Sequence, residues 1–147
     1  GLNGKPRPIS LEHGKKAIQW NRTTEWTKEN ILNRVEKVGE GEGWIEERTG
    51  LHDGSFIETR RHWFTGKVMH HTGGVVNILN LVEGREAIVE SPIKAFEPYV
   101  IHYAETFIVP ASVGTYTIRP YGESEGKRLA TIKAYVRTEN LPNNLSN

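Results

Sequence analysis

The sequence predicts an all-β domain folded as a jelly roll, with a short and partly helical lead-in before it. Three observations predict this fold. From Ser55 onward, short apolar runs recur between turn signals at the spacing typical of sandwiches and barrels. Glycines mark the turns, as at Gly73-Gly74 and Gly84. A chain of 147 residues is long enough for one such core, so we expect one domain after the lead-in.

The lead-in begins as an extended arm and continues into a helix. Pro6 and Pro8 fix their own φ angles and bias the preceding residues away from helix. Ser10 is placed to act as the N-cap of a helix over residues 11–18. The run from Ile31 to Val38 fits either a helix or a strand, and we favour an extended conformation there.

The glycine-rich stretch Gly39–Gly43 is expected to be a flexible break, so the roll is predicted to start at Trp44. The last eight residues, NLPNNLSN at 140–147, are polar and predict a frayed C-terminal tail. We therefore divide the chain into a lead-in arm and linker over residues 1–43, a jelly-roll domain over residues 44–139, and a disordered tail over residues 140–147.

The strands of the roll are predicted from their apolar alternation. The run over residues 75–82 is mostly apolar on both faces, so it is expected to be a central strand. In the last strand, Leu129–Val136, the face expected to point inward consists of Ala130, Ile132, Ala134 and Val136. The other strands are expected at residues 56–64, 87–90, 99–103, 106–109 and 116–119. Short antiparallel strands of this kind favour a jelly roll, which protects its edges by doubling the sheet.

Composition excludes several classes of protein. The formal net charge is +1, from 19 basic and 18 acidic residues, so no strong field favours nucleic acid or an anionic membrane. The chain has no cysteine, which rules out disulfides and thiolate metal sites and fits a reducing cytoplasm, where we expect the protein to be located. No apolar run approaches the ~20 residues that span a bilayer.

Three segments have sequences typical of a known family. They are HYAETFIVPASVGTYTIRPYG at 102–122, VNILNLVEGREAIVESP at 76–92 and KRLATIKAYVR at 127–137. They resemble the carboxy-terminal cupin-like domain of class I mannose-6-phosphate isomerases. The segment NGKPRPISLEHGKKAI, at 3–18, resembles the stretch that leads out of the catalytic domain in that family. The resemblance implies a cupin-like jelly roll, or double-stranded β-helix, at the tail end of a longer enzyme whose catalytic domain is absent here.

What the resemblance implies about function is indirect. In that family, a zinc site with Gln, His, Glu and His ligands converts mannose 6-phosphate to fructose 6-phosphate, and these ligands precede the region that resembles Asn3–Ile18. None can be assigned to this chain. The resemblance therefore implies a roll that is non-catalytic by itself and braces the upstream catalytic domain, with zinc and a sugar phosphate bound by the full-length protein. Whether this chain alone is an enzyme is left open.

An independent metal site in the roll would need two or three histidines and a glutamate that converge. His70 and His71 precede Gly73-Gly74, but no glutamate follows at the required short spacing. Tyr116 stands where a ligand histidine would be expected. Adjacent strand residues point to opposite faces, so both histidines cannot bind one metal from within a strand. We therefore expect no metal in this chain, and expect His70 and His71 to cap an exposed loop.

Four residues are candidates for substrate binding. His102 and Glu105 lie three residues apart at the start of a hairpin, and His62 lies near Arg60 on an earlier strand. Such residues can form an acid/base pair with an anion clamp, because arginine forks suit phosphate. The alternative interpretation is that these side chains solvate a sheet face at the strand edges.

Aromatic residues leave further functions open. Tyrosines such as Tyr99 and Tyr103 either stack on sugars, as in an autonomous carbohydrate-binding module, or fill the roll. A dimerising module is another alternative, because the two-sided strand over residues 75–82 permits an apolar face for a homodimer. Trp20 and Trp26 either pin the arm onto the roll or packed against the absent catalytic domain.

Overall fold

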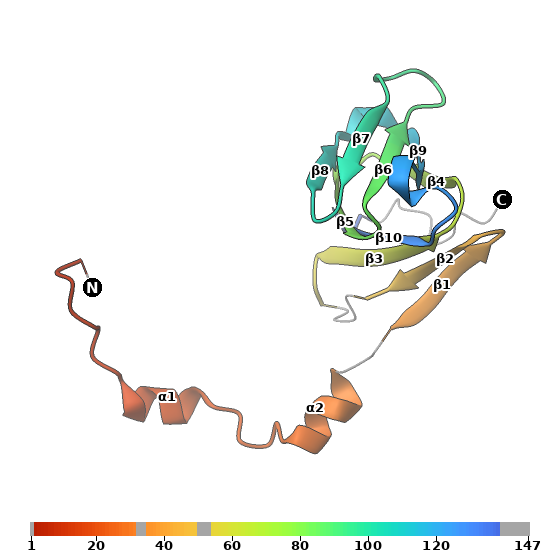
Figure 1. The fold of residues 1–147 in the computed structure, drawn as a ribbon. Helices are drawn as coiled ribbons and strands as arrows, with labels where there is room; N and C mark the ends of the chain where they lie inside the picture. Colours follow the sequence, from red (N-terminus) through yellow and green to blue (C-terminus); the bar gives the residue numbers. More distant parts are fainter. Residues whose placement is uncertain (1, 32–34, 50–53, 139–147) are drawn as a thin grey trace. The chain divides into compact units, whose positions relative to one another are not determined.

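The chain contains two compact units, each described here by itself. The computed structural model describes residues 2–31, 35–49 and 54–138. The first unit, Gly1–Arg34, holds two short helices, and the second, Val35–Asn147, holds a roll of two sheets (Figure 1). The boundary expected after residue 43 therefore falls inside the second unit. The tail predicted over residues 140–147 lies outside the described residues.

The lead-in unit contains α1 (Leu11–Ala17) and α2 (Thr24–Asn30). The helix predicted after Ser10 is confirmed, although the Ser10 side chain makes no capping hydrogen bond. The second helix is not among the predicted elements. Its N-cap is Thr23, whose hydroxyl oxygen accepts from the backbone N–H of Trp26 at 3.3 Å.

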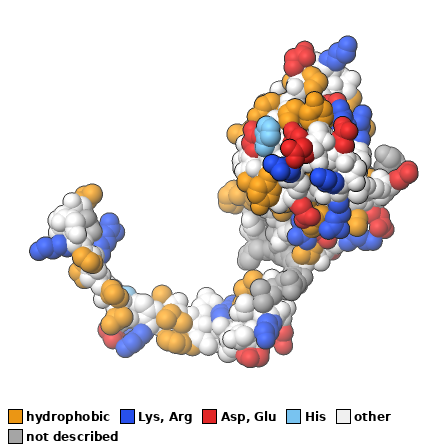
Figure 2. All heavy atoms as spheres, in the orientation of Figure 1, with side chains coloured by type: hydrophobic (Ala, Val, Ile, Leu, Met, Phe, Trp, Pro, Cys, Tyr) orange, Lys and Arg blue, Asp and Glu red, His pale blue; other side chains and the backbone are white. Residues whose placement is uncertain are grey.

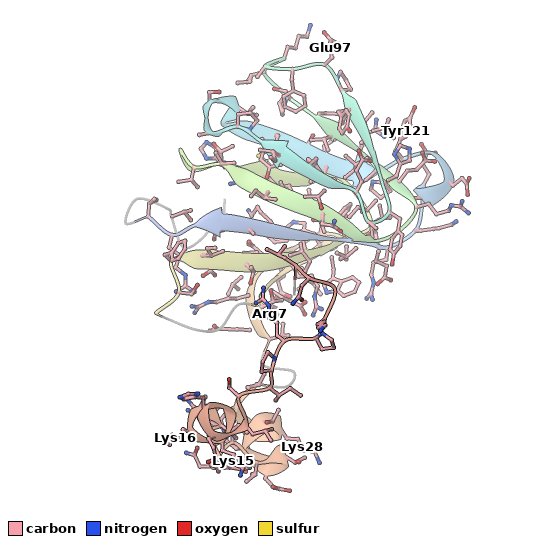
Figure 3. The ribbon with its side chains drawn as sticks, turned by 90° about the vertical axis from the view of Figure 1, so that its left-hand side faces the viewer. Arg7, Lys15, Lys16, Lys28, Glu97 and Tyr121 are labelled. Carbon is pink, nitrogen blue, oxygen red and sulfur yellow. The ribbon has the colours of Figure 1, made fainter. Side chains whose placement is uncertain are left out.

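Basic side chains lie on both helices of the lead-in (Figure 3). Lys15 and Lys16 occupy the last turn of α1, where a positive charge complements the helix dipole. The guanidinium of Arg22 lies 3.7 Å from the ring centroid of Trp26. Trp26 thus has a partner within its own unit, and what Trp20 and Trp26 pack against beyond that unit stays a prediction. Neither of the two described helices has the length and apolar character needed to cross a membrane.

The predicted all-β jelly roll is confirmed: ten strands of the described residues form two antiparallel sheets (Figure 1). The six-stranded sheet consists, in spatial order, of β1 (Glu36–Gly41), β2 (Trp44–Arg48), β3 (Ile57–Phe64), β10 (Leu129–Val136), β5 (Asn77–Glu83) and β8 (Thr106–Val109). The four-stranded sheet consists of β4 (Val68–His71), β9 (Thr115–Pro120), β6 (Glu86–Glu90) and β7 (Tyr99–His102). Two short 3₁₀ turns, Ala111–Val113 and Gly122–Ser124, precede β9 and β10.

The glycine-rich stretch before Trp44 is a β-hairpin, so the expectation of a flexible break there is wrong. β1 pairs with β2 from Glu36 opposite Arg48 to Gly41 opposite Trp44. A Cβ atom on Gly41 would overlap the indole of Trp44, and one on Gly39 would lie 3.3 Å from the same ring. These two glycines therefore allow the tryptophan to lie close against the backbone of β1.

Several predicted strands have nearly the expected bounds. The last strand, Leu129–Val136, has the bounds predicted for it. In the ambiguous run, Val38 lies in β1, which confirms the extended conformation at that end, whereas Ile31 follows the last turn of α2. The four-residue strand β4 is not among the predicted strands.

Ala130 is buried as predicted, but beyond it the face of β10 that points inward is the opposite of the one predicted. From residue 131 onward, Thr131 and Lys133 are buried, whereas Ile132 and Ala134 are only half-buried. The prediction is wrong because it assumed that the more apolar face of a strand lies against the core. In this part of the roll the interior is polar.

An apolar core fills the rest of the space between the sheets, where side chains from both meet (Figure 3). It consists of Phe64, Val68, Leu79, Leu81, Ala87, Val89, Ile101, Val109, Tyr116, Ile118 and Leu129. The predicted central strand, β5, lies between β10 and β8, which confirms its interior position. Val76, just before this strand, and Ile78, on its outward face, are nearly half exposed. Figure 2 shows apolar side chains on the visible face of the roll among charges of both signs, and the homodimer stays a prediction.

Candidate functional site

Polar side chains line the inner face of the six-stranded sheet beside the apolar core. Strand residues two apart share a face, so alternate residues of β2, β3 and β10 point inward together. They form two cross-strand rows, Glu46–His62–Thr131 and Arg48–Arg60–Lys133. Together with two further buried residues they make up the interior polar cluster, which consists of Glu46, Arg48, Glu58, Arg60, His62, His70, Thr131 and Lys133.

Glu58 is the anionic centre of one half of the cluster. Its side chain is 5% exposed, and its Oε1 atom lies 2.6 Å from Nε of Arg60 and 3.3 Å from Nε of Arg48. The other oxygen, Oε2, accepts a hydrogen bond from Nε of Arg137 at 2.7 Å. A buried carboxylate is tolerated only when it is paired, so these guanidinium groups and Glu58 depend on one another.

His62 and Glu46 form a buried pair in the other half. Nε2 of His62 donates to Oε1 of Glu46 at 3.1 Å. Burial lowers the pKa of His62 and outweighs the attraction of the carboxylate, so the imidazole is neutral at pH 7. Burial would raise the pKa of Glu46, but the hydrogen bond from His62 and the nearby positive charges prevail and lower this pKa to about 2. The lone pair of His62 then lies on Nδ1, which is buried without a hydrogen-bond partner among the described residues.

His70 is fully buried between two rings. Its imidazole meets that of His62 edge to face, with ring centroids 4.5 Å apart, and stacks on Tyr116 at 5.2 Å. Neither ring nitrogen of His70 has a hydrogen-bond partner within residues 2–31, 35–49 and 54–138. Burial, aided by the nearby His62 and Lys133, lowers the pKa of His70 well below its usual value. The neutral ring therefore holds one unused donor and one unused acceptor.

The expectation that His70 and His71 cap an exposed loop is right for His71 alone. His71 points outward, and its Nδ1 atom accepts from the backbone N–H of Gly73 at 2.8 Å. Because adjacent strand residues point to opposite faces, the same strand turns His70 into the roll. The four residues of β4 are too few for alternation to reveal this in the sequence.

Lys133 and Thr131 complete the cluster from β10. Lys133 is 5% exposed, and its amine makes no hydrogen bond or ion pair with another described residue. Burial lowers the pKa of Lys133 to about 8, against the attraction of Glu46, so the amine is still mostly protonated at pH 7. The hydroxyl oxygen of Thr131 is buried and also lacks a partner in the described part of the chain.

A phenol occupies one of the expected metal-ligand positions. Tyr116 stands where a ligand histidine would be expected, and its hydroxyl donates to Oδ1 of Asn77 at 2.9 Å. Burial raises the pKa of Tyr116, so the phenol keeps its proton. No group of three or more potential metal ligands from His, Cys, Asp and Glu occurs among the residues that the structure describes. The phenol of Tyr116 is thus satisfied by Asn77 and stands in place of an imidazole ligand.

The four predicted substrate-binding residues lie in two different places. Arg60 and His62 are buried inside the roll, so the alternative in which they solvate a strand edge is wrong. His102 is exposed, and its ring nitrogen Nδ1 lies 3.1 Å from Oε2 of Glu105. Glu105 also accepts from the hydroxyl of Tyr99 at 2.7 Å. The four residues therefore do not form a single anion-binding site. Substrate binding by any of them stays a prediction.

An open hollow with a volume of 790 Å³ lies beside His102. Its lining includes Arg85, Glu86, Tyr103 and Glu123. The ring of Tyr103 is 64% exposed and available for stacking. The hollow is where a carbohydrate-binding module of the kind predicted from the tyrosines would bind sugar, and that function stays a prediction.

Glu46, Glu58 and Lys133 are functional candidates that the sequence interpretation missed. A signal for two of them exists in the alternation of the strands. Glu46 lies two residues from the partly buried Trp44, and Glu58 is in phase with Phe64 on β3. Charged residues in phase with an inward aromatic residue indicate a polar interior, because every second side chain of a strand shares a face.

We expect the stability of the protein to fall as the pH drops below about 6.5. The folded-state pKa values of His62 and His70 are lowered, so the unfolded chain binds more protons than the folded one in this range. Each neutral histidine then contributes a loss of about 1.4 kcal/mol per pH unit. The groups that face these rings are Glu46, Arg60, Lys133 and Tyr116.

Urea unfolding at several pH values between 5 and 7.5 measures this effect. The lowered pKa of Glu46 adds a further loss between about pH 4.5 and 2, because that carboxylate must be protonated there. A free energy of unfolding that stays constant from pH 7 to 5 would contradict this, because it would show that both histidines titrate alike in the folded and unfolded states.

Comparisons with known proteins support the fold. No protein-family model matches the chain, and neither does any curated protein. Among solved structures, ectoine synthase from P. lautus is similar with a TM-score of 0.54 and 14% identity, over 74% of this chain and 73% of that chain. An RmlC-like cupin from Shewanella frigidimarina is similar with a TM-score of 0.54 and 18% identity, over 75% of this chain and 90% of that one. At such identities the likeness shows the fold alone, and the roll is a cupin fold, as predicted.

A third similar structure is a protein from Archaeoglobus fulgidus that has been provisionally assigned as a mannosephosphate isomerase. It matches with a TM-score of 0.49 and 24% identity, over 64% of this chain but only 28% of that chain. This similarity is too weak to support a function for the present chain.

Proposed function

We propose that this chain is a non-catalytic cupin roll that accompanies and braces the catalytic domain of a mannose-6-phosphate isomerase-like enzyme. The observation that carries the proposal is the hydrogen bond between Tyr116 and Asn77. Tyr116 stands where a metal-binding roll would be expected to present a ligand histidine, and Asn77 accepts the hydrogen bond of its phenol. The isomerisation needs a Lewis acid to polarise the oxygens of the sugar. In this proposal the roll holds no metal, and that chemistry belongs to another domain.

The link to an isomerase rests on sequence. The segments at 76–92, 102–122 and 127–137 resemble the carboxy-terminal domain of that family, and the segment at 3–18 resembles the stretch before it. The first three of these segments include β5, β6, β8, β9 and β10, so the resemblance extends over much of the roll. In this proposal the sugar phosphate and the zinc belong to the upstream domain.

A coupled assay for conversion of mannose 6-phosphate to fructose 6-phosphate tests the proposal. We expect no turnover by the purified, folded chain with added zinc, and no stoichiometric zinc in the protein. As a positive counterpart, the double variant Asn77→Glu/Tyr116→His is expected to bind about one equivalent of zinc, because it places an anionic oxygen and an imidazole beside His70. Adding His70→Leu to that variant is the matched control and should remove the binding.

Turnover by the unmodified chain that rises and saturates with zinc would overturn the proposal. One equivalent of tightly held zinc in the unmodified chain would overturn it as well. Either result would mean that the roll contains a metal centre despite the Tyr116–Asn77 hydrogen bond.

A further inference from the structure

We infer that the interior polar cluster binds a small hydroxylated anion, such as a sugar phosphate or a sugar acid, through the amine of Lys133 and buried polar atoms that lack partners. This site lies in the roll itself. It does not depend on the roll being part of an isomerase, because none of its groups takes part in the proposed bracing role.

The unpartnered atoms are the first step of the argument. They are Nδ1 of His62, both ring nitrogens of His70 and the hydroxyl oxygen of Thr131. They lie together, since the two imidazoles are in contact and Thr131 is the cross-strand partner of His62. Proteins pair nearly all of their buried polar atoms, so four such atoms in one place indicate a polar partner that binds there.

The donors and acceptors of these groups indicate what that partner is. His62 offers an acceptor, because its only N–H is donated to Glu46. His70 offers one donor and one acceptor, and the hydroxyl of Thr131 offers both. An oxyanion only accepts hydrogen bonds, whereas a hydroxyl group both donates and accepts. The mixture therefore favours the hydroxyl groups of a polyol or a sugar at this end of the site.

The charge of the cluster favours an anion at the other end. Lys133 lies opposite Arg60 across the strands. Its amine lies 5.4 Å from the ring centroid of Tyr135 but makes no hydrogen bond or ion pair with another described residue. Arg48 and Arg60 already lie against the carboxylate of Glu58, and Arg48 also lies against that of Glu36, so the charge left for a ligand is that of Lys133. A phosphate or carboxylate group would pair with the Lys133 amine through a charge-assisted hydrogen bond.

The polar side chains become more exposed step by step toward the surface. The exposed fraction is 0% at His70, 5% at Lys133, 17% at Glu46, 21% at Arg48 and 24% at Arg137. The cluster therefore meets solvent on the side of Arg48 and Arg137, and this is the side from which a ligand would enter. The ligand would lie with its hydroxyl groups at the buried histidines and its charge at Lys133.

Isothermal titration calorimetry of the purified chain at pH 7 tests the inference. The probes are D-mannose 6-phosphate, D-gluconate, D-mannose and inorganic phosphate. We expect at least one of the two hydroxylated anions to bind with one ligand per chain, and at least about tenfold more tightly than D-mannose or inorganic phosphate. Which of the two binds distinguishes a sugar phosphate from a sugar acid. Binding is measured without turnover, so the result is independent of the isomerase assay.

Variants place the bound ligand in the roll. Lys133→Met should weaken binding at least about tenfold, because it removes the paired charge but keeps most of the side-chain volume. Lys127→Met, at an exposed turn residue, is the matched control and should leave binding unchanged. Thr131→Val is nearly isosteric and serves as a second test if Lys133→Met fails to fold. It should weaken binding several-fold.

Two results would overturn the inference. The first is that neither hydroxylated anion binds at millimolar concentration to the folded chain. The second is that binding survives both Lys133→Met and Thr131→Val but is lost in Tyr103→Ala, which would place the ligand in the surface hollow instead.

Discussion

Replacing Glu58 with glutamine is expected to lower the free energy of unfolding by about 3 kcal/mol. Glu58 is a buried carboxylate that lies within 3.3 Å of Nε atoms on Arg48, Arg60 and Arg137. Glutamine keeps the shape but removes the charge, so three cations lose their common counter-ion. Urea unfolding of the variant and of the unmodified chain measures the change.

The matched control is Glu90→Gln. Glu90 also pairs with an arginine, Arg119, through two hydrogen bonds of 3.1 Å, but both side chains are partly exposed. A pair of this kind contributes about 0–1 kcal/mol, so the control should change stability little. If Glu58→Gln lowers the free energy of unfolding no more than Glu90→Gln does, the arginines around Glu58 are solvated in the folded state. Glu58 is then not their buried counter-ion.

Replacing His70 with leucine is expected to raise the free energy of unfolding by about 1 kcal/mol. Both ring nitrogens of His70 are buried without a partner among the described residues, and a buried polar group in that state costs stability. Leucine has a similar volume and no polar atom, so it removes this cost. Part of the gain is offset, because the contacts of the ring with His62 and Tyr116 are lost.

His71→Leu is the control, since the neighbouring side chain points outward and accepts a hydrogen bond from Gly73. It should leave stability unchanged or lower it slightly. The His70 variant should also lose part of the acid sensitivity of the fold, because one neutral buried imidazole is gone. A loss of more than about 1 kcal/mol in His70→Leu would show that His70 is a structural residue with partners in the folded protein, and not a residue kept for a ligand.

The jelly roll and much of its strand pattern were predictable because they depend on local signals. Alternation gave the bounds of the last strand, and the proline and glycine around residues 110–114 marked the turn before Tyr116. The contacts of Tyr116 with the ring of His70 and with Asn77 depend on tertiary structure, so local sequence signals could not predict them. The sequence could show only that Tyr116 stood in place of a ligand, not that its hydroxyl would satisfy Asn77.

The interior polar cluster was harder to predict, for a physical reason. A sequence pattern assigns the apolar face of a strand to the core, and in β10 that rule selected Ile132 and Ala134 over Thr131 and Lys133. The rule fails when charged groups on neighbouring strands compensate one another, as Glu46 does for its neighbours here. Such compensation depends on which strands are adjacent, and β2 was not recognised as a strand at all.

The most direct test of the proposal that the polar interior holds no metal is nuclear magnetic resonance of the histidine side chains. Long-range proton–nitrogen spectra of the ¹⁵N-labelled chain at pH 7 report the protonation and ligation of each imidazole nitrogen. We expect the ring nitrogens of His62 and His70 to show neutral imidazoles whose signals do not move when one equivalent of zinc is added. A shift of the His70 nitrogens that is complete at one equivalent of zinc would contradict this and would place a metal centre inside the roll.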